Sequence, residues 1–108
     1  MVGPFSVTQV DTVVIYTSPG AYILSRDGKH AHYVGRSDVD IRSRIKQSIQ
    51  EQNCSFFWIE YTTSPRDAYR LECEWWHKFG TPPPGNVNHP PVPAGTSWRC
   101  PVAGCPWS

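Results

Sequence analysis

The chain lacks an apolar segment of about 18 residues, the minimum for a membrane-spanning helix. Its first residues, MVGPFSVTQVD, also lack the charged start and apolar stretch of a signal peptide. We therefore expect an intracellular, cytoplasmic protein with no membrane partner.

Excess charge and internal repeats are absent as well. The net charge is +1 over 108 residues, which excludes a protein that binds polyanions over its whole surface. The absence of repeats excludes a repeat architecture. The length suits one domain, residues 1–108, with a core at about 12–80 and a tail at 81–108.

Aliphatic residues are modest in number, but aromatic residues are not. The chain has five Trp, five Tyr and four Phe, and each buried ring removes about 150–250 Å² from water. A small aromatic core is therefore expected. Charge is also uneven, because residues 26–46 carry six basic and three acidic side chains and so predict a local basic face.

Residues 20–37 have the pattern of a β-hairpin followed by the N-cap of a helix. We predict a strand at 20–25, a turn at Asp27-Gly28 and a partner strand at 30–34. Ile41, Ile45 and Ile49 recur every four residues, which predicts a helix capped by Ser37 or Asp38.

The second half begins with the aromatic run SFFWIEYTT at 55–63, which predicts a third strand. Ser64 and Pro65 have the residue types of an N-cap and a first helical position, so a second helix should run to Gly80. The expected fold is α+β, with a small antiparallel three-stranded sheet flanked by helices. Eight of the eleven prolines follow residue 81, so the tail should be irregular, but ordered around Trp98 and Trp107.

Glu72 falls within the apolar face that Leu71, Trp75 and Phe79 form on the second helix. A carboxylate there needs a cation, hydrogen-bond donors or a metal, because its burial is otherwise costly. Three interpretations stay open: a buried salt bridge with an arginine, a side chain at the edge of the apolar face that reaches out to solvent, and a metal ligand. Arg44 similarly flanks the apolar stripe of the first helix.

Several short motifs occur in an order that resembles the GIY-YIG nucleases. Gly20-Ala21-Tyr22 is similar to the first motif and Tyr33-Val34-Gly35 to the second. The stretch 36–45 is similar to the helix that carries the family's arginine, here Arg44, and 68–72 matches the pattern that ends in its metal-binding glutamate, here Glu72. Asn86 stands where an asparagine closes the site. The resemblance covers residues 20–88 and implies the corresponding fold.

The resemblance implies a metal-dependent endonuclease. Glu72 would hold Mg²⁺ or Mn²⁺, Tyr22 would activate water with a pKa lowered by the cation, and Arg44 would neutralise the phosphate. Tyr33 would hydrogen-bond phosphate or water, and Asn86 would buttress the site. DNA is the expected substrate rather than RNA, with a protein partner or dimer for specificity. The expected nucleic-acid contacts are Lys29, His32, Arg36, Arg42 and Lys46.

The chain departs from the family pattern at three positions. One extra residue between Gly35 and Arg44 leaves Arg42 as a second candidate for the arginine, and Ser48 stands where many members have a histidine. Asn88 is the alternative to Asn86. For the tyrosines, the alternative role is a cross-strand aromatic pair.

The cysteines and histidines of the C-terminal part predict a structural zinc site. Cys73 and His77 are four residues apart on one helix flank, and Cys100 and Cys105 bracket a short turn. We predict that these four residues bind Zn²⁺, with His89 as the rival fourth ligand; the alternative is that Cys73 is a buried thiol. Two other functions stay open, an idle nucleic-acid-binding module and a zinc-stabilised interaction domain.

Overall fold

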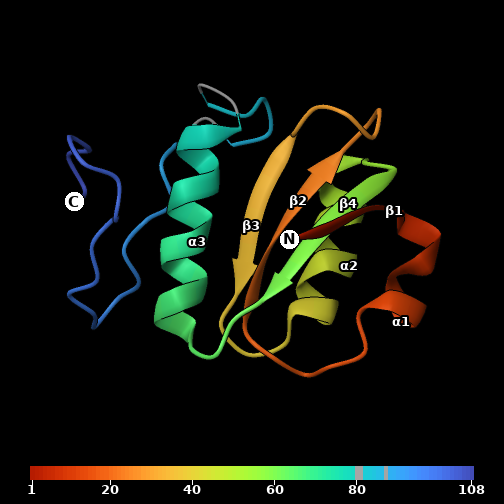
Figure 1. Ribbon diagram of the computed structural model, residues 1–108, viewed down its shortest axis with the longest axis horizontal. Coiled ribbons are helices and arrows are strands. Elements are labelled where there is room, and N and C mark those ends of the chain that lie inside the picture. The colour runs from red at the N-terminus through yellow and green to blue at the C-terminus, as the bar shows by residue number, and fades with distance from the viewer. Residues whose placement is uncertain (80–81, 87) are drawn as a thin grey trace.

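The computed structural model of the chain describes residues 1–79, 82–86 and 88–108. The elements follow one another as drawn in Figure 1: β1 (Val2–Ser6), the 3-10 helix η1 (Val7–Gln9), α1 (Val10–Val13), β2 (Gly20–Ser25), β3 (Tyr33–Ser37), α2 (Ile41–Gln52), β4 (Phe56–Tyr61) and α3 (Pro65–Lys78). The fold is α+β, as expected. Among the described helices, none has the length and apolar character that crossing a membrane requires.

The sheet has four antiparallel strands in the order β1-β4-β2-β3, so the prediction of three strands was wrong. The missed strand, β1, contains Gly3 and Pro4, which are both rare in strands. It pairs only with β4, at an edge of the sheet, and an edge strand tolerates proline because its outer side needs no donor.

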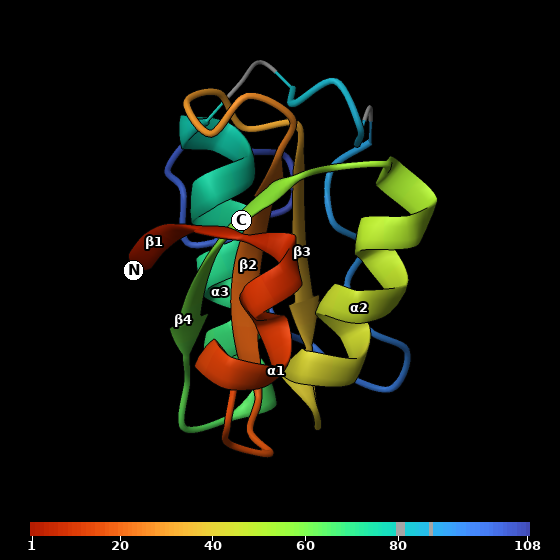
Figure 2. The same cartoon turned by 90° about the vertical axis from the view of Figure 1, so that its right-hand side faces the viewer.

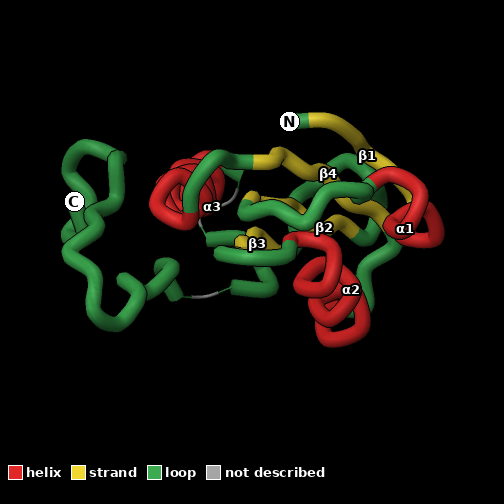
Figure 3. Tube along the Cα trace, turned by 90° about the horizontal axis from the view of Figure 1, so that it is seen from below, coloured by secondary structure: helices red, strands yellow, loops and turns green. Residues whose placement is uncertain are grey.

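Helices cover both faces of the sheet. Tyr22 and Leu24 of β2 point to the face packed by α1 and α2, whereas Ala21 and Ile23 point to the face packed by α3. Figures 2 and 3 show this layering, with the strands between α3 and the α1–α2 pair. All of β2 is buried, because it lies inside the sheet and is covered on both faces.

The hairpin between β2 and β3 has a longer connection than predicted, since β3 begins at Tyr33 and not at residue 30. The Asp27 carboxylate accepts hydrogen bonds from the backbone N–H groups of Lys29 and His30, both at 2.8 Å. Ser25 Oγ accepts another from Gly28 N at 3.0 Å. Side-chain oxygens thus accept hydrogen bonds from backbone N–H groups of the loop. In a tight two-residue turn, such groups would pair with the opposite strand.

The cap of α3 is as predicted and that of α2 is not. Ser64 Oγ accepts from Asp67 N and Pro65 occupies the first turn of α3. Asp40, rather than Ser37 or Asp38, caps α2 by accepting from Arg42 N. Ser37 Oγ instead accepts from the N–H groups of Val39 and Asp40 in the preceding loop. The predicted stop at Gly80 lies outside the described residues.

The two motif glycines are explained by packing alone. A Cβ on Gly35 would lie 2.5 Å from both Cζ and the hydroxyl oxygen of Tyr22, which crosses it from the neighbouring strand. A Cβ on Gly20 would lie 2.6 Å from the Glu60 carbonyl oxygen and 2.6 Å from Ile41 Cδ1. Both positions therefore admit only glycine without displacement of the sheet or of α2.

The tail passes along the side of α3 that faces away from the sheet (Figure 1). Its described residues form turns and no helix or strand, as predicted. Cys100 and Cys105 pack against Tyr69 and Cys73 of α3 in a small buried cluster, which keeps the tail ordered without regular backbone hydrogen bonds.

Candidate active site and metal centre

A cavity of about 380 Å³ opens at the free edge of β3, between α2 and α3. It brings together residues that are distant in sequence. Its lining consists of Tyr33, Arg36, Ser37, Asp38, Arg44, Glu72 and Pro91. The cavity therefore combines three expected catalytic residues, Tyr33, Arg44 and Glu72, with a charged pair from the end of β3 and a proline of the tail.

Glu72 is buried on α3, as the apolar face predicted, and it has a cationic partner. Arg36 Nη1 donates to Glu72 Oε1 at 2.7 Å, and Arg36 Nε donates to Asp38 Oδ1 at 3.1 Å. Burial raises the pKa of Glu72, and Arg36 opposes this shift. Glu72 thus forms the buried salt bridge of the first interpretation and also lines the cavity, because the same carboxylate does both.

The arginine of α2 that lines the cavity is Arg44. Its side chain is exposed, and Nη1 donates to Gln47 Oε1 at 3.0 Å on the next helical turn. Arg42 is not among the described residues that line the cavity. A guanidinium at this rim is free to bind an anion that enters from solvent.

The two tyrosines lie side by side but in different surroundings. Their rings are 6.3 Å apart, as a cross-strand pair would be. Tyr33 is half-buried and lines the cavity, whereas Tyr22 is fully buried and its hydroxyl shares a 2.5 Å hydrogen bond with Ser48 Oγ. Burial raises the pKa of both phenols. We expected a bound cation to lower the pKa of Tyr22. The protein by itself has the opposite effect, because burial raises that pKa.

Asn86 pairs with the edge of β3 at Val34. Its Nδ2 donates to the Val34 carbonyl at 2.6 Å, and Val34 N donates to its Oδ1 at 3.4 Å. The side chain thereby takes the place of a neighbouring strand at this point. Asn88 is exposed. Asn86 therefore buttresses β3 at Val34, and it is not among the described residues that line the cavity.

The predicted basic residues have different partners. Arg36 is bound in the cavity, and Lys46 Nζ donates to both oxygens of Asp11 at 3.1 and 3.2 Å. Lys29 lines a separate small cavity beside Trp58. The backbone oxygen of His32 accepts from the tail, and burial lowers the pKa of its ring. Arg36 and Lys46 are therefore already paired with carboxylates, and the five nucleic-acid contacts stay a prediction.

A second cluster joins α3 to the tail. The ligand atoms of His77, His89, Cys100 and Cys105 all lie within 4.8 Å of one another, and this group could hold a metal ion such as zinc. The set corrects our prediction, because His89 takes the place given to Cys73. Cys73 is fully buried with Tyr69, Cys100 and Cys105, so it is a buried thiol next to the four candidate ligands and not one of them.

The protonation of His89 fits metal binding. Its Nδ1 lies 2.8 Å from the Pro90 carbonyl, which can only accept, so Nδ1 carries the proton. The lone pair of a neutral ring is then on Nε2, and this atom is buried without a hydrogen-bond partner among the described residues. A histidine that donates from one nitrogen and offers the other is the usual form of a metal ligand.

Glu72 does not belong to any group of three candidate ligands within the described part of the chain. A magnesium ion there would need its remaining ligands from water and phosphate, which is how this ion is commonly held.

No family model, curated protein or solved structure matches this chain.

Two contacts were not predicted from the sequence, that of Arg36 with Glu72 and that of Ser48 with Tyr22. Arg36 had been expected only as a contact to nucleic acid, but it is the partner of Glu72. Ser48 had been noted only as a departure from a family pattern, but it binds the Tyr22 hydroxyl. Strand alternation could have placed Arg36 on the α3 face with Val34, because the two are separated by one residue.

Proposed function

We propose that this chain is a metal-dependent endonuclease that hydrolyses phosphodiester bonds, with DNA as its substrate. The observation that carries the proposal is the cavity at the edge of β3, where the carboxylate of Glu72, the guanidinium of Arg44 and the phenol of Tyr33 come from three different elements. The resemblance of the motifs to the GIY-YIG nucleases supports the same activity.

Each side chain has a role that its position allows. Arg36 occupies Glu72 Oε1, while Oε2 accepts no hydrogen bond from the described residues and is the atom we assign to the metal. When bound, Mg²⁺ or Mn²⁺ would supply positive charge for the phosphate and the leaving oxygen. Arg44 at the rim would orient and neutralise the scissile phosphate.

The tyrosines divide the remaining work. Tyr33 lines the cavity, so we assign to it the hydrogen bond to phosphate or to the attacking water. The Tyr22 ring packs against the Tyr33 ring and would keep it in position. The water-activating role that the resemblance gives to Tyr22 requires its hydroxyl to leave Ser48 and to lose a proton despite a pKa raised by burial.

We further infer that His77, His89, Cys100 and Cys105 bind one structural Zn²⁺. Four protein ligands complete a tetrahedron and leave no open position for substrate, which is typical of structural sites. The ion would fix the tail to α3. This cluster also favours the second candidate function, a zinc-stabilised binding module without catalytic activity.

A panel of labelled substrates tests the proposed activity. We expect purified protein to cleave some DNA when Mg²⁺ or Mn²⁺ is added, and not when EDTA is added, because the carboxylate needs the ion to act on phosphate. The panel contains duplex, single-stranded and branched DNA and RNA. Complete inertness on all four with both metals would contradict the nuclease proposal and leave the binding module.

The two arginines of α2 provide a matched pair. We expect Arg44→Ala to reduce the cleavage rate by about 10²-fold or more, because it removes the guanidinium at the cavity. Arg42→Ala removes the same group from a position outside the lining and should change the rate by no more than about threefold. Initial rates at saturating metal measure both. The reverse ranking would show that Arg42 contacts the phosphate.

A further inference from the structure

A larger groove lies on the other side of α3, between this helix and the tail. Its volume is about 660 Å³. One wall is the outer face of α3 and the other is the segment that follows Thr96. The lining residues are Arg66, Arg70, Ser97, Trp98, Arg99, Cys100, Pro101 and Ser108. None of the three arginines was among the residues expected to bind nucleic acid.

The groove concentrates positive charge in a chain whose net charge is only +1. Arg66, Arg70 and Arg99 form no salt bridge within the described residues. Arg99 Nη1 donates a hydrogen bond to the backbone oxygen of Ser108 at 3.3 Å. Three guanidinium groups that line one groove create a positive potential there, which favours the binding of an anion.

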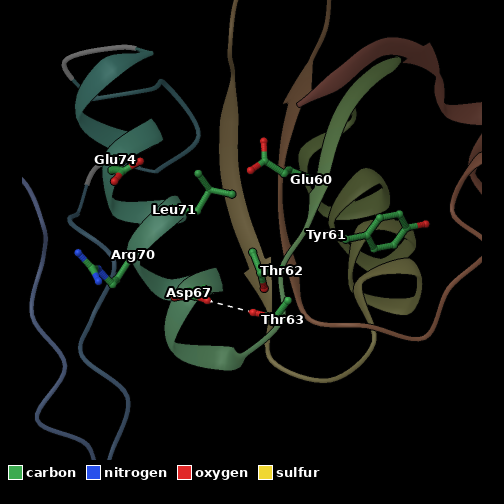
Figure 4. Close-up of a pocket in the computed structure, with 8 residues that line it drawn as sticks. All are labelled: Glu60, Tyr61, Thr62, Thr63, Asp67, Arg70, Leu71 and Glu74. Atoms are coloured by element: carbon green, nitrogen blue, oxygen red, sulfur yellow. Dashed lines mark hydrogen bonds between the residues drawn. The ribbon is translucent and has the colours of Figure 1, made fainter.

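An acidic cleft adjoins the groove at Arg70. Arg70 also borders a cavity between β4 and α3 that contains Glu60, Asp67 and Glu74. Figure 4 shows the Arg70 side chain directed toward the tail, away from Glu60 and from Asp67, whose carboxylate accepts from Thr63 at 3.2 Å. Arg70 therefore lines both cavities, and its guanidinium lies on the side of the groove.

An aromatic side chain completes the groove. Trp98 is half-buried, and its ring lies 6.2 Å from that of Tyr69. The contact holds the indole in place while part of it stays accessible. Arginines beside an accessible indole are the combination that binds nucleic-acid strands, since guanidinium groups hold phosphates and the indole stacks on bases.

We propose that this groove binds the phosphodiester backbone of a DNA strand outside the cleavage cavity. Arg70 and Glu72 are two residues apart on α3, so they project about 200° apart around the helix, and groove and cavity lie on opposite flanks. Cys100 belongs both to the groove and to the candidate zinc centre, so the metal would hold the Trp98–Arg99 wall against α3. The inference rests on the proposed function for the identity of the anion.

Binding of labelled DNA without cleavage tests the groove. Zinc-loaded protein is titrated against single-stranded and duplex oligonucleotides by fluorescence anisotropy, with neither added Mg²⁺ nor chelator. We expect Arg66→Gln/Arg70→Gln to weaken binding more than about tenfold. The slope of log K against log salt should become shallower by about 2, one counterion for each lost phosphate contact.

The control removes two positive charges elsewhere. Arg26→Gln/Lys78→Gln has the same net charge as the groove variant and should weaken binding by less than about threefold. Arg99→Gln, on the opposite wall, should show a smaller loss in the same direction as the groove variant. Because all five side chains are exposed or at the surface, circular dichroism should report an unchanged fold for each variant.

Three results would overturn the inference: equal loss in both double variants, wild-type binding by the groove variant, or no binding of DNA by the wild type. Cleavage with Mg²⁺ is scored separately. If the protein cleaves DNA but binds it independently of the groove residues, the groove proposal is wrong and the nuclease proposal stands. Binding through the groove by a protein that never cleaves would keep the groove and reject the nuclease.

Discussion

Replacing Glu72 with Gln should abolish cleavage and leave the chain folded. The substitution removes the negative charge that we assign to the metal but retains nearly the same volume. The Gln carbonyl can still accept from Arg36 Nη1, which lies 2.7 Å from the carboxylate, and Arg36 keeps Asp38 as an ionic partner. We expect a rate loss of more than about 10²-fold, measured as initial rates with Mg²⁺, and a stability loss of about 1–3 kcal/mol from the weakened pair.

Glu74→Gln is the matched control for this variant. Glu74 lies two residues further along α3 and is exposed, so the same chemical change should alter the cleavage rate by less than about threefold. If Glu72→Gln cleaves at the wild-type rate, Glu72 serves only as the structural partner of Arg36. Thermal unfolding monitors the fold, and Glu72→Asp provides a second variant, which keeps the charge but withdraws it from the cavity.

Removing the metal from the His77–His89–Cys100–Cys105 cluster should have the largest effect on stability. We expect one Zn²⁺ per chain, because the four ligand atoms already lie within 4.8 Å of one another. Structural zinc contributes several kcal/mol or more to small domains, so stripping it should lower Tm by roughly 10–20 °C. The tail would separate from α3, and cleavage would fall indirectly. Elemental analysis and thermal unfolding measure these effects.

Two substitutions distinguish the ligand sets. His89→Ala should lose zinc, because it removes the only nitrogen of that ring that is free to bind. Cys73→Ala should keep zinc, because Cys73 packs with Cys100 and Cys105 but is not one of the four candidate ligands. Retention by His89→Ala with loss by Cys73→Ala would restore the original prediction. Protein without zinc, in which all four free cysteines titrate in the folded state, would contradict a metal site altogether.

Local chemistry in the sequence determined the parts of the fold that depend on near neighbours. Ser64 and Pro65 specify the start of α3, since a side-chain acceptor and a fixed φ act within one turn. The same short range explains the helical period of Ile41, Ile45 and Ile49. The apolar face of α3 correctly placed Glu72 in a buried position, because the direction of a side chain follows from its helical spacing.

Only the tertiary structure decided which of the equivalent residues act together. Nothing near Tyr22 or Tyr33 in sequence distinguishes them; Ser48, from α2, buries the hydroxyl of one, and the free edge of β3 exposes the other. His89 replaced Cys73 in the metal cluster because the path of the tail, and not the helix period, sets where the fourth ligand lies.

The fourth strand and the arginine groove share this origin. β1 pairs with β4 across more than fifty residues, and local propensity at Gly3 and Pro4 opposes a strand. Arg66 and Arg99 meet because the tail folds back on α3. The sequence by itself determined the local elements and the burial of Glu72, since those depend on contacts within a turn. Packing determined the partners of each side chain, because contacts between distant segments form only when the whole chain is folded.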